Sequence, residues 1–215
     1  MSEFEFKGCV EIKELLGRRA DDERQLLDLI EEVPVDSIYY HTHSFFLRHF
    51  YFAGAYPNDF ANWAAIQVRD RVLGEKLAEV TPSGVGSLED IRTELIEIID
   101  SHLSSIKVVP VIVYGQPFYF MQSKIIEIST GIKVNNLGAF IEALKTIDAS
   151  AIYNHMFEAR LRVRRRRSDF AIWIAAALGM IELAQKVENI DSYMYSLEGL
   201  RNKLIDLCNY QLQNE

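Results

Sequence analysis

The sequence predicts a mainly α-helical protein made of two tandem, internally duplicated units of about four helices each, with short extended segments at the start of each unit. The 215 residues are 49% hydrophobic and include only 11 glycines and 5 prolines, so core-forming side chains are plentiful and loop formers are few. Apolar residues repeat at the spacing of three and four that is typical of amphipathic helices. Similar blocks of sequence also recur, in the same order, in the two halves of the chain.

The recurring blocks define the predicted domains. Three pairs of blocks align at offsets of 114, 110 and 109 residues: Ser37–His41 with Ala151–His155, Asn58–Trp63 with Ser168–Trp173, and Ser87–Arg92 with Ser196–Arg201. We therefore expect a first repeat over 1–104, an apolar connector over 105–117 and a second repeat over 118–215. The connector is rich in β-branched residues and lacks the Gly/Ser composition of a flexible linker, so we expect the two repeats to pack as one globular body.

The elements of the first repeat follow from its start signals. A β-rich segment from Phe4 to Gly17 predicts a short extended stretch, and the apolar spacing from Asp22 to Glu32 predicts a helix. Short polar side chains before apolar periods are typical helix N-caps, because they accept a hydrogen bond from a free backbone N–H. The predicted caps of the next three helices are Asp36, Asn58 and Ser87.

The second repeat gives the same pattern. An extended stretch is expected from Phe118 to Gly131, followed by a helix whose face carries Phe140 and Leu144. The predicted caps of the later helices are Ser150, Ser168 and Ser196.

Composition limits the cellular context. The apolar run Phe170–Ile181 is too short to cross a bilayer, and the acidic start does not resemble a secretory signal, so we expect a cytoplasmic protein with no membrane association. Cys9 and Cys208 stand alone near opposite ends, which favours reduced packing cysteines. The formal charge of -8 is unevenly distributed, because the acidic excess lies almost entirely before residue 108.

The motif combination resembles a bacterial and archaeal family of unknown function. Its elements are Ile-Tyr-x-His, Asp-Phe-Ala-x-Trp and Ser-Leu-Glu-x-(Ile or Leu)-Arg, in tandem. The resemblance covers almost the whole chain and implies a two-copy layout. Some members resemble accessory segments attached to, or encoded near, glycosyltransferases, so the resemblance implies a fold and a neighbourhood but no reaction. The matching positions are Tyr39, His41, Arg48, Asp59, Phe60, Trp63 and Arg92, with Tyr153, His155, Arg162, Asp169, Phe170, Trp173 and Arg201.

A histidine and an arginine share a helical face in each repeat. His41 and Arg48, like His155 and Arg162, are seven residues apart and so point in nearly the same direction on a helix. Such a pair can bind a carboxylate or phosphate. The favoured alternative is a structural role, in which the histidines bind other helices and the arginines pair with Asp59 and Asp169. His41-Thr-His43 does not predict a metal site, because residues i and i+2 point about 200° apart.

Each repeat also places an aspartate four residues before a tryptophan. Asp59 with Trp63, and Asp169 with Trp173, could form a platform for a sugar, since an aromatic face stacks and a carboxylate accepts hydroxyl hydrogen bonds. Phe60 and Phe170 between them favour a packed core instead.

Six arginines lie within residues 160–167, including Arg162 and Arg165. The run can contact a polyanion, but the acidic overall charge and the absence of interleaved aromatic residues make nucleic acid the least favoured partner. An acidic protein surface is favoured, and a small phosphorylated ligand is next. The partners considered are therefore another protein, a second copy of this chain or an anionic small molecule.

These observations favour a non-catalytic binding or protein-interaction module, for an anionic small ligand or accessory to carbohydrate metabolism. The alternative is a small-molecule hydrolase or transferase that uses His41 or His155 as general base. No cofactor-binding, metal-binding or nucleophile motif is found in the sequence.

Overall fold

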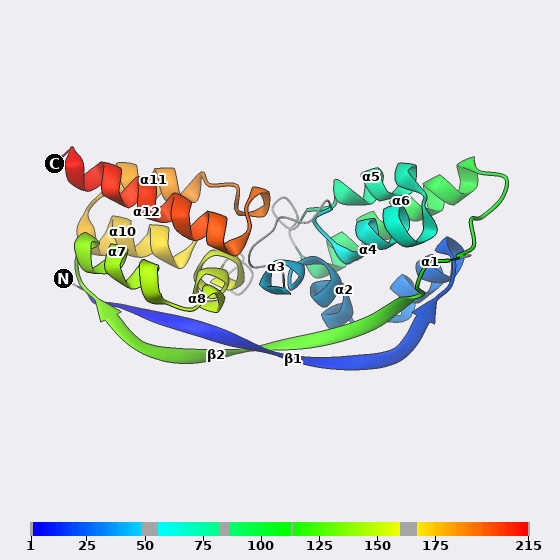
Figure 1. Cartoon of the computed structure of the whole chain (residues 1–215), viewed down its shortest axis with the longest axis horizontal. Helices are drawn as coiled ribbons and strands as arrows, with labels where there is room; N and C mark the ends of the chain where they lie inside the picture. The colour runs from blue at the N-terminus through cyan, green and yellow to red at the C-terminus, as the bar shows by residue number, and fades with distance from the viewer. Residues whose placement is uncertain (1, 49–55, 82–86, 113, 160–166, 215) are drawn as a thin grey trace. The chain divides into compact units, whose positions relative to one another are not determined.

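The computed structural model describes residues 2–48, 56–81, 87–112, 114–159 and 167–214. They form two long strands, β1 (Phe4–Ala20) and β2 (Phe118–Val134), that pair in a two-stranded sheet, together with a set of mostly short helices (Figure 1). The pairing is antiparallel: Ser129 donates a hydrogen bond to Glu5, and Gln122 donates one to Glu14.

The described chain divides into two compact units. Unit 1 contains residues 2–10 and 125–214, and unit 2 contains residues 11–48 and 56–124, each with the gaps given above. Each strand therefore belongs to both units. The expected repeats, 1–104 and 118–215, remain a prediction about how the sequence arose, and the compact units draw residues from both sides of these boundaries.

The helices of unit 2 follow β1 in the chain. They are α1 (Glu23–Glu32), α2 (Val35–Thr42), α3 (Phe45–Arg48), α4 (Asp59–Asn62), the π-helix η1 (Trp63–Val68), α5 (Arg71–Ala78) and α6 (Leu88–Ser105). The long helix α6 packs on α1, α2 and α5.

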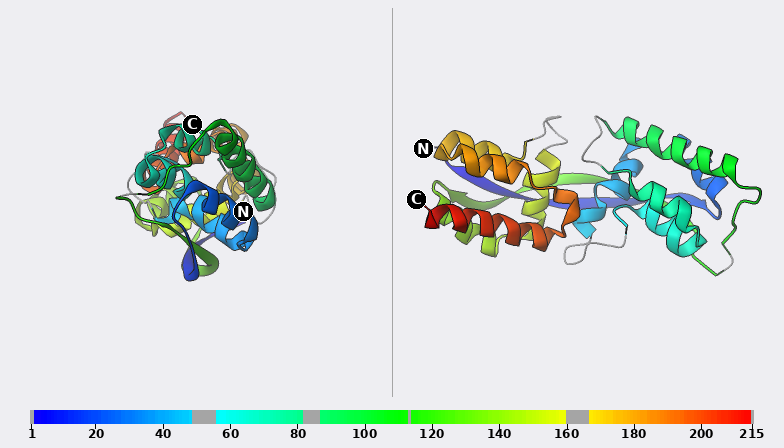
Figure 2. Two further views of the ribbon diagram at one scale, coloured as in Figure 1. Left: turned by 90° about the vertical axis from the view of Figure 1, so that its right-hand side faces the viewer. Right: turned by 90° about the horizontal axis from the view of Figure 1, so that it is seen from above.

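The helices of unit 1 follow β2. They are α7 (Leu137–Thr146), α8 (Ala149–Tyr153), the π-helix η2 (Asn154–Glu158), α10 (Asp169–Leu178), α11 (Ile181–Glu188), the 3-10 helix η3 (Ser192–Met194) and α12 (Leu197–Gln213). Helix α12 lies along α7, as the right-hand view of Figure 2 shows in red and yellow-green.

The predicted fold class is wrong. The protein combines helices with a sheet of two 17-residue strands, so it is neither all-α nor two duplicated four-helix units with short extended segments. The strands do not end at Gly17 and Gly131, whose φ angles of 67° and 73° let the backbone bend and continue to Ala20 and Val134. Their length was missed because Val10, Ile12 and Leu15 are about half exposed, so apolar residues in that stretch do not mark a buried face.

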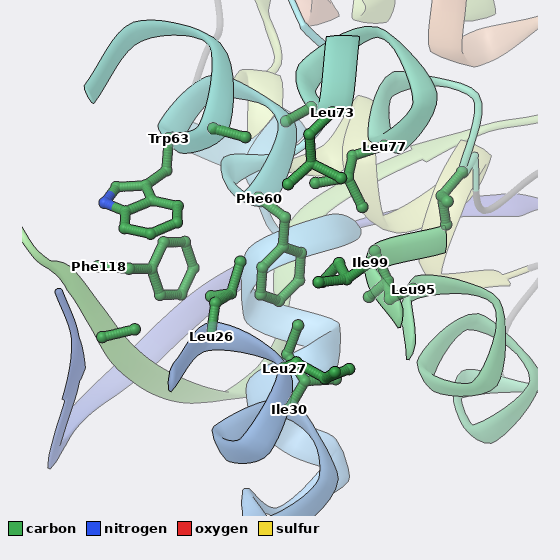
Figure 3. Close-up of a cluster of buried hydrophobic side chains, with 14 of the residues drawn as sticks. Leu26, Leu27, Ile30, Phe60, Trp63, Leu73, Leu77, Leu95, Ile99 and Phe118 are labelled. Carbon is green, nitrogen blue, oxygen red and sulfur yellow. The ribbon is translucent and has the colours of Figure 1, made fainter. Parts of the chain in front are cut away.

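The strands complete the cores of both units. Phe4 and Phe6 at the start of β1 pack on Phe140 of α7 and Phe170 of α10 in unit 1. In unit 2, the start of β2 brings Phe118 onto Phe60 and Trp63 (Figure 3). These two aromatic residues join aliphatic side chains from α1, α5 and α6, which Figure 3 labels as Leu26, Leu27, Ile30, Leu73, Leu77, Leu95 and Ile99. Each of these cores therefore combines helix side chains with side chains of a strand that is distant in the sequence.

Most predicted helix starts are confirmed, with two exceptions. Asp22, Asn58, Ser87, Ser168 and Ser196 cap helices through side-chain oxygens that accept backbone N–H groups. The predicted caps Asp36 and Ser150 are wrong. Pro34 precedes α2 without a side-chain cap, and Asp148 caps α8 by accepting from the Ser150 backbone.

Two further expectations can be compared with the structure. Cys9 and Cys208 are buried and free, as expected of packing cysteines. No helix in the described ranges is both long and apolar enough to span a bilayer. A cytoplasmic location remains a prediction.

Candidate functional site

A pocket of about 340 Å³ opens in unit 2 beside the start of β2. It brings together four residues singled out from the sequence: His41 of α2, Arg48 of α3, Asp59 of α4 and Trp63 of η1. Among its remaining lining residues are Tyr40, Asn62, Gln67, Gln116 and Phe118. Its volume lies within the range of small-molecule sites.

Asp59 links the other polar groups of this pocket. Its Oδ2 atom lies 2.8 Å from Nδ1 of His41 and 2.6 Å from Nη2 of Arg48. Asp59 is the first residue of α4, after the Asn58 cap, so its carboxylate lies at the positive end of the helix. The structure thus contains the predicted pairing of Arg48 with Asp59.

His41 connects this carboxylate to the strand. Its Nε2 lies 3.0 Å from the backbone nitrogen of Met121 in β2. Since a backbone N–H can only donate, Nε2 must accept, and the ring proton must be on Nδ1, where it is donated to Asp59. His41 is only 3% exposed, and its burial lowers the pKa, with Asp59 acting in the opposite direction. The neutral ring therefore hydrogen-bonds to both α4 and β2, and we call this arrangement the histidine–aspartate clamp.

Arg48 is only partly engaged. Its hydrogen bonds to described residues start from Nη2, which donates to Asp59 and to the carbonyl oxygen of Tyr40. Nε is buried and has no partner in the described part of the chain. The guanidinium group lies 4.0 Å from the centre of the Tyr40 ring, which fixes its plane by a cation–π contact. Tyr40 is buried, and this burial raises the pKa of its hydroxyl, although Arg48 partly offsets the effect.

Trp63 belongs mainly to the core. It is 5% exposed, its indole Nε1 donates to the carbonyl oxygen of Gln116, and its ring packs edge-on against Phe118. The Gln116 backbone nitrogen donates in turn to the side chain of Gln67. This agrees with the packed-core interpretation of the Asp-Trp spacing, although Trp63 also lines the pocket.

Unit 1 contains a comparable clamp. His155 of η2 lies 2.9 Å from Asp169 through Nδ1, and its Nε2 accepts from the Lys7 backbone in β1 at 2.9 Å. Trp173 donates to the carbonyl oxygen of Ser2. A pocket of about 360 Å³ beside this clamp is bordered by the carboxylates of Glu3, Glu5, Glu127 and Asp169 and by Lys7. Its described wall is therefore mostly acidic.

Part of the predicted site is not described. Arg162 and Arg165 lie outside the described residues, so the pairing of Arg162 with Asp169 and the binding of a ligand by either arginine stay predictions. Arg167 at the end of the run forms an ion pair with Glu188 of α11, at 3.1 Å.

Sequence reasoning missed the contributions of the strands. Met121, Gln116 and Lys7 reach the clamps through backbone groups, and backbone groups carry no residue-type signal. It also missed the role of Arg92 and Arg201. Their guanidinium groups bind carbonyl oxygens at the ends of α1 and α7, where a cation complements the helix dipole.

The fold and its sites define a helical protein built on a two-stranded antiparallel ribbon, with a histidine–aspartate clamp in each compact unit. The chain belongs to a family of unknown function, DUF5752, which it matches over residues 1–209. It is similar in structure to OrfY from Thermoproteus tenax, with a TM-score of 0.75 and 23% sequence identity, over 97% of this chain and 95% of that one. At 23% sequence identity, this similarity is evidence about the fold alone. No curated protein matches the chain.

Proposed function

We propose that this protein is a non-catalytic binding module, and that the pocket around Arg48 and Asp59 receives a small solute with an anionic group. The single observation that carries the proposal is the state of Arg48. This side chain is held in position by Asp59 and Tyr40, yet only Nη2 of its three guanidinium nitrogens is engaged with described residues. A prepositioned arginine whose Nη1 group has no acceptor among the described residues suits a carboxylate or phosphate.

The rest of the pocket supports a polar ligand of moderate size. Amide side chains of Asn62, Gln67 and Gln116 can hydrogen-bond to hydroxyl groups, while Tyr40 and Trp63 form part of the pocket wall. Sugar phosphates combine an anionic group with hydroxyls. They are also the ligands suggested by the resemblance to proteins found near glycosyltransferases, so they are the first solutes to test.

The same geometry favours binding over acid–base chemistry. A general base needs a lone pair within reach of the substrate proton. The Nε2 lone pairs of His41 and His155 already accept backbone N–H groups, and the Nδ1 protons are donated to Asp59 and Asp169.

Calorimetric titration with a panel of sugar phosphates and nucleotides tests the proposal. We expect one ligand class to bind the wild type, with an affinity that falls as salt is raised. Arg48→Lys keeps the charge but loses the planar fork, and it should weaken binding by about tenfold or more. Arg18→Ala is a matched control in the same unit, because Arg18 is exposed and lies outside the pocket.

Two results would contradict the proposal. One is the absence of binding to any member of the panel, and the other is equal binding by the wild type and Arg48→Lys. The variants Arg162→Ala and Arg165→Ala belong in the same experiment. A loss of affinity in these two alone would move the ligand to the arginine run of the second half, as the sequence predicted.

A further inference from the structure

We propose that Glu23, Asp70 and His102 form a binding site for one divalent transition-metal ion, of the zinc class, inside unit 2. Each residue offers one ligand atom, and these three atoms all lie within 4.8 Å of one another. The site is separate from the pocket at Arg48 and does not depend on the function proposed for that pocket.

Three different helices supply the ligands. Glu23 is the first residue of α1, and His102 lies in the last turn of α6. Asp70 is the N-cap of α5. Its Oδ1 accepts a hydrogen bond from the backbone N–H of Leu73, and its Oδ2 lies 2.8 Å from Nε2 of His102. Helix α6 packs on both α1 and α5, so the three ligands are brought together by the packing of the unit.

Glu23 is the observation that points to a cation. Its side chain is fully buried, and neither carboxylate oxygen has a hydrogen-bond partner among the described residues. A buried carboxylate without a hydrogen-bond partner is costly. A divalent ion would neutralise Glu23 and Asp70 together.

The distances fit a metal ion after small side-chain adjustments. Nε2 of His102 lies 2.8 Å from Asp70 and 3.9 Å from Glu23. Ligands of a tetrahedral zinc ion, with bonds of about 2.0–2.1 Å, are separated by about 3.3 Å, which falls between these two values. Binding would use the Nε2 lone pair of His102 and leave the ring proton on Nδ1.

The types of ligand atom narrow the choice of metal ion. One imidazole nitrogen with two carboxylate oxygens suits Zn²⁺ and its first-row neighbours better than the all-oxygen cations Ca²⁺ and Mg²⁺. The Asp70 side chain is 14% exposed, which leaves one edge open for the ion to enter and for a water to complete its coordination. Bound there, the ion would join α1, α5 and α6.

The sequence does not reveal this site. Residues 23, 70 and 102 are far apart and fit no ligand motif, so the sequence predicts no metal site at these positions. Only the packing of the three helices places the ligands side by side.

Metal titration of the chelator-treated full chain tests the proposal. With Zn²⁺ as the probe, we expect one tightly bound ion per chain by elemental analysis after desalting, and an increase of several degrees in melting temperature. Glu23→Gln removes a ligand while keeping its shape, and it should lose both effects. Glu97→Gln is the matched control, because Glu97 is exposed on the same helix as His102 and should leave both unchanged.

Asp70→Asn provides a second test if Glu23→Gln fails to fold, since asparagine preserves the N-cap but is a poor zinc ligand. It should also lose the bound ion. Absence of a retained ion in the wild type, or equal retention by the wild type and either ligand variant, would overturn the proposal. In either case Glu23 would be a buried acid that binds no metal ion.

Discussion

At the scale of single residues, burial sets the chemistry of the histidines. His43 is 1% exposed, and this burial lowers its pKa from 6.5 to about 3. His41 is shifted in the same direction by its burial. Histidines of this kind are neutral packing groups in the folded protein, whatever their sequence context suggests.

The His43 shift predicts a loss of stability in acid. Below a pH of about 6.5 the unfolded chain binds a proton at this ring and the folded chain does not, so stability should fall by up to about 1.4 kcal/mol per pH unit. The loss continues as the pH approaches 3, where the folded ring also titrates. His43→Gln removes this titration and can still hydrogen-bond to Thr42, which His43 contacts at 3.0 Å.

Urea unfolding of the wild type and His43→Gln between pH 4.5 and 7.5 measures the effect. The variant should lose less stability than the wild type as the pH is lowered. Identical pH slopes would show that His43 can be protonated without cost in the folded state.

At the scale of elements, an arginine closes the end of α1. Nη1 of Arg92, on α6, donates to the carbonyl oxygens of Ile30 and Val33, and Nε donates to Glu89. Arg92→Met keeps the apolar stem and removes the donors. We expect a loss of about 1–3 kcal/mol in unfolding free energy, measured by urea denaturation, because charged hydrogen bonds to a helix end are lost.

Arg24→Met provides the comparison for this prediction. Arg24 lies on α1 and is half exposed, and its ion pair with Asp100 is long, at 4.0 Å. Its replacement should change stability by less than about 0.5 kcal/mol. Equal losses in the two variants would mean that Arg92 acts only as a surface charge.

The helices and strands also show which features the amino-acid sequence could predict and which it could not. Helix caps such as Asn58 and Ser168 were found because a capping side chain and the apolar period after it are local signals. The Arg48–Asp59 pair was predicted as the structural alternative to an anion site, and the structure contains it. The full strand length, the Met121 contact and the Glu23–Asp70–His102 cluster were not predictable, because each depends on segments that meet only after folding.

At the scale of the whole molecule, each compact unit depends on strand residues that the sequence analysis assigns to the other repeat. Unit 1 needs Phe4 and Phe6, while unit 2 needs Phe118 and Phe120, which are fully or almost fully buried. Loss of one buried phenylalanine costs about 3–5 kcal/mol, and whole domains are stable by only about 5–15 kcal/mol. A fragment that lacks such a pair should not keep a native core.

Fragments of residues 1–107 and 108–215 test this dependence. The first lacks the β2 residues of unit 2, and the second lacks the β1 residues of unit 1. We expect neither to show a cooperative thermal transition by circular dichroism, and an equimolar mixture to recover one together with a 1:1 complex on size exclusion. Cooperative unfolding of the isolated second fragment would instead support independent repeats with the boundaries predicted from the sequence, because its helices would then form a core without Phe4 and Phe6.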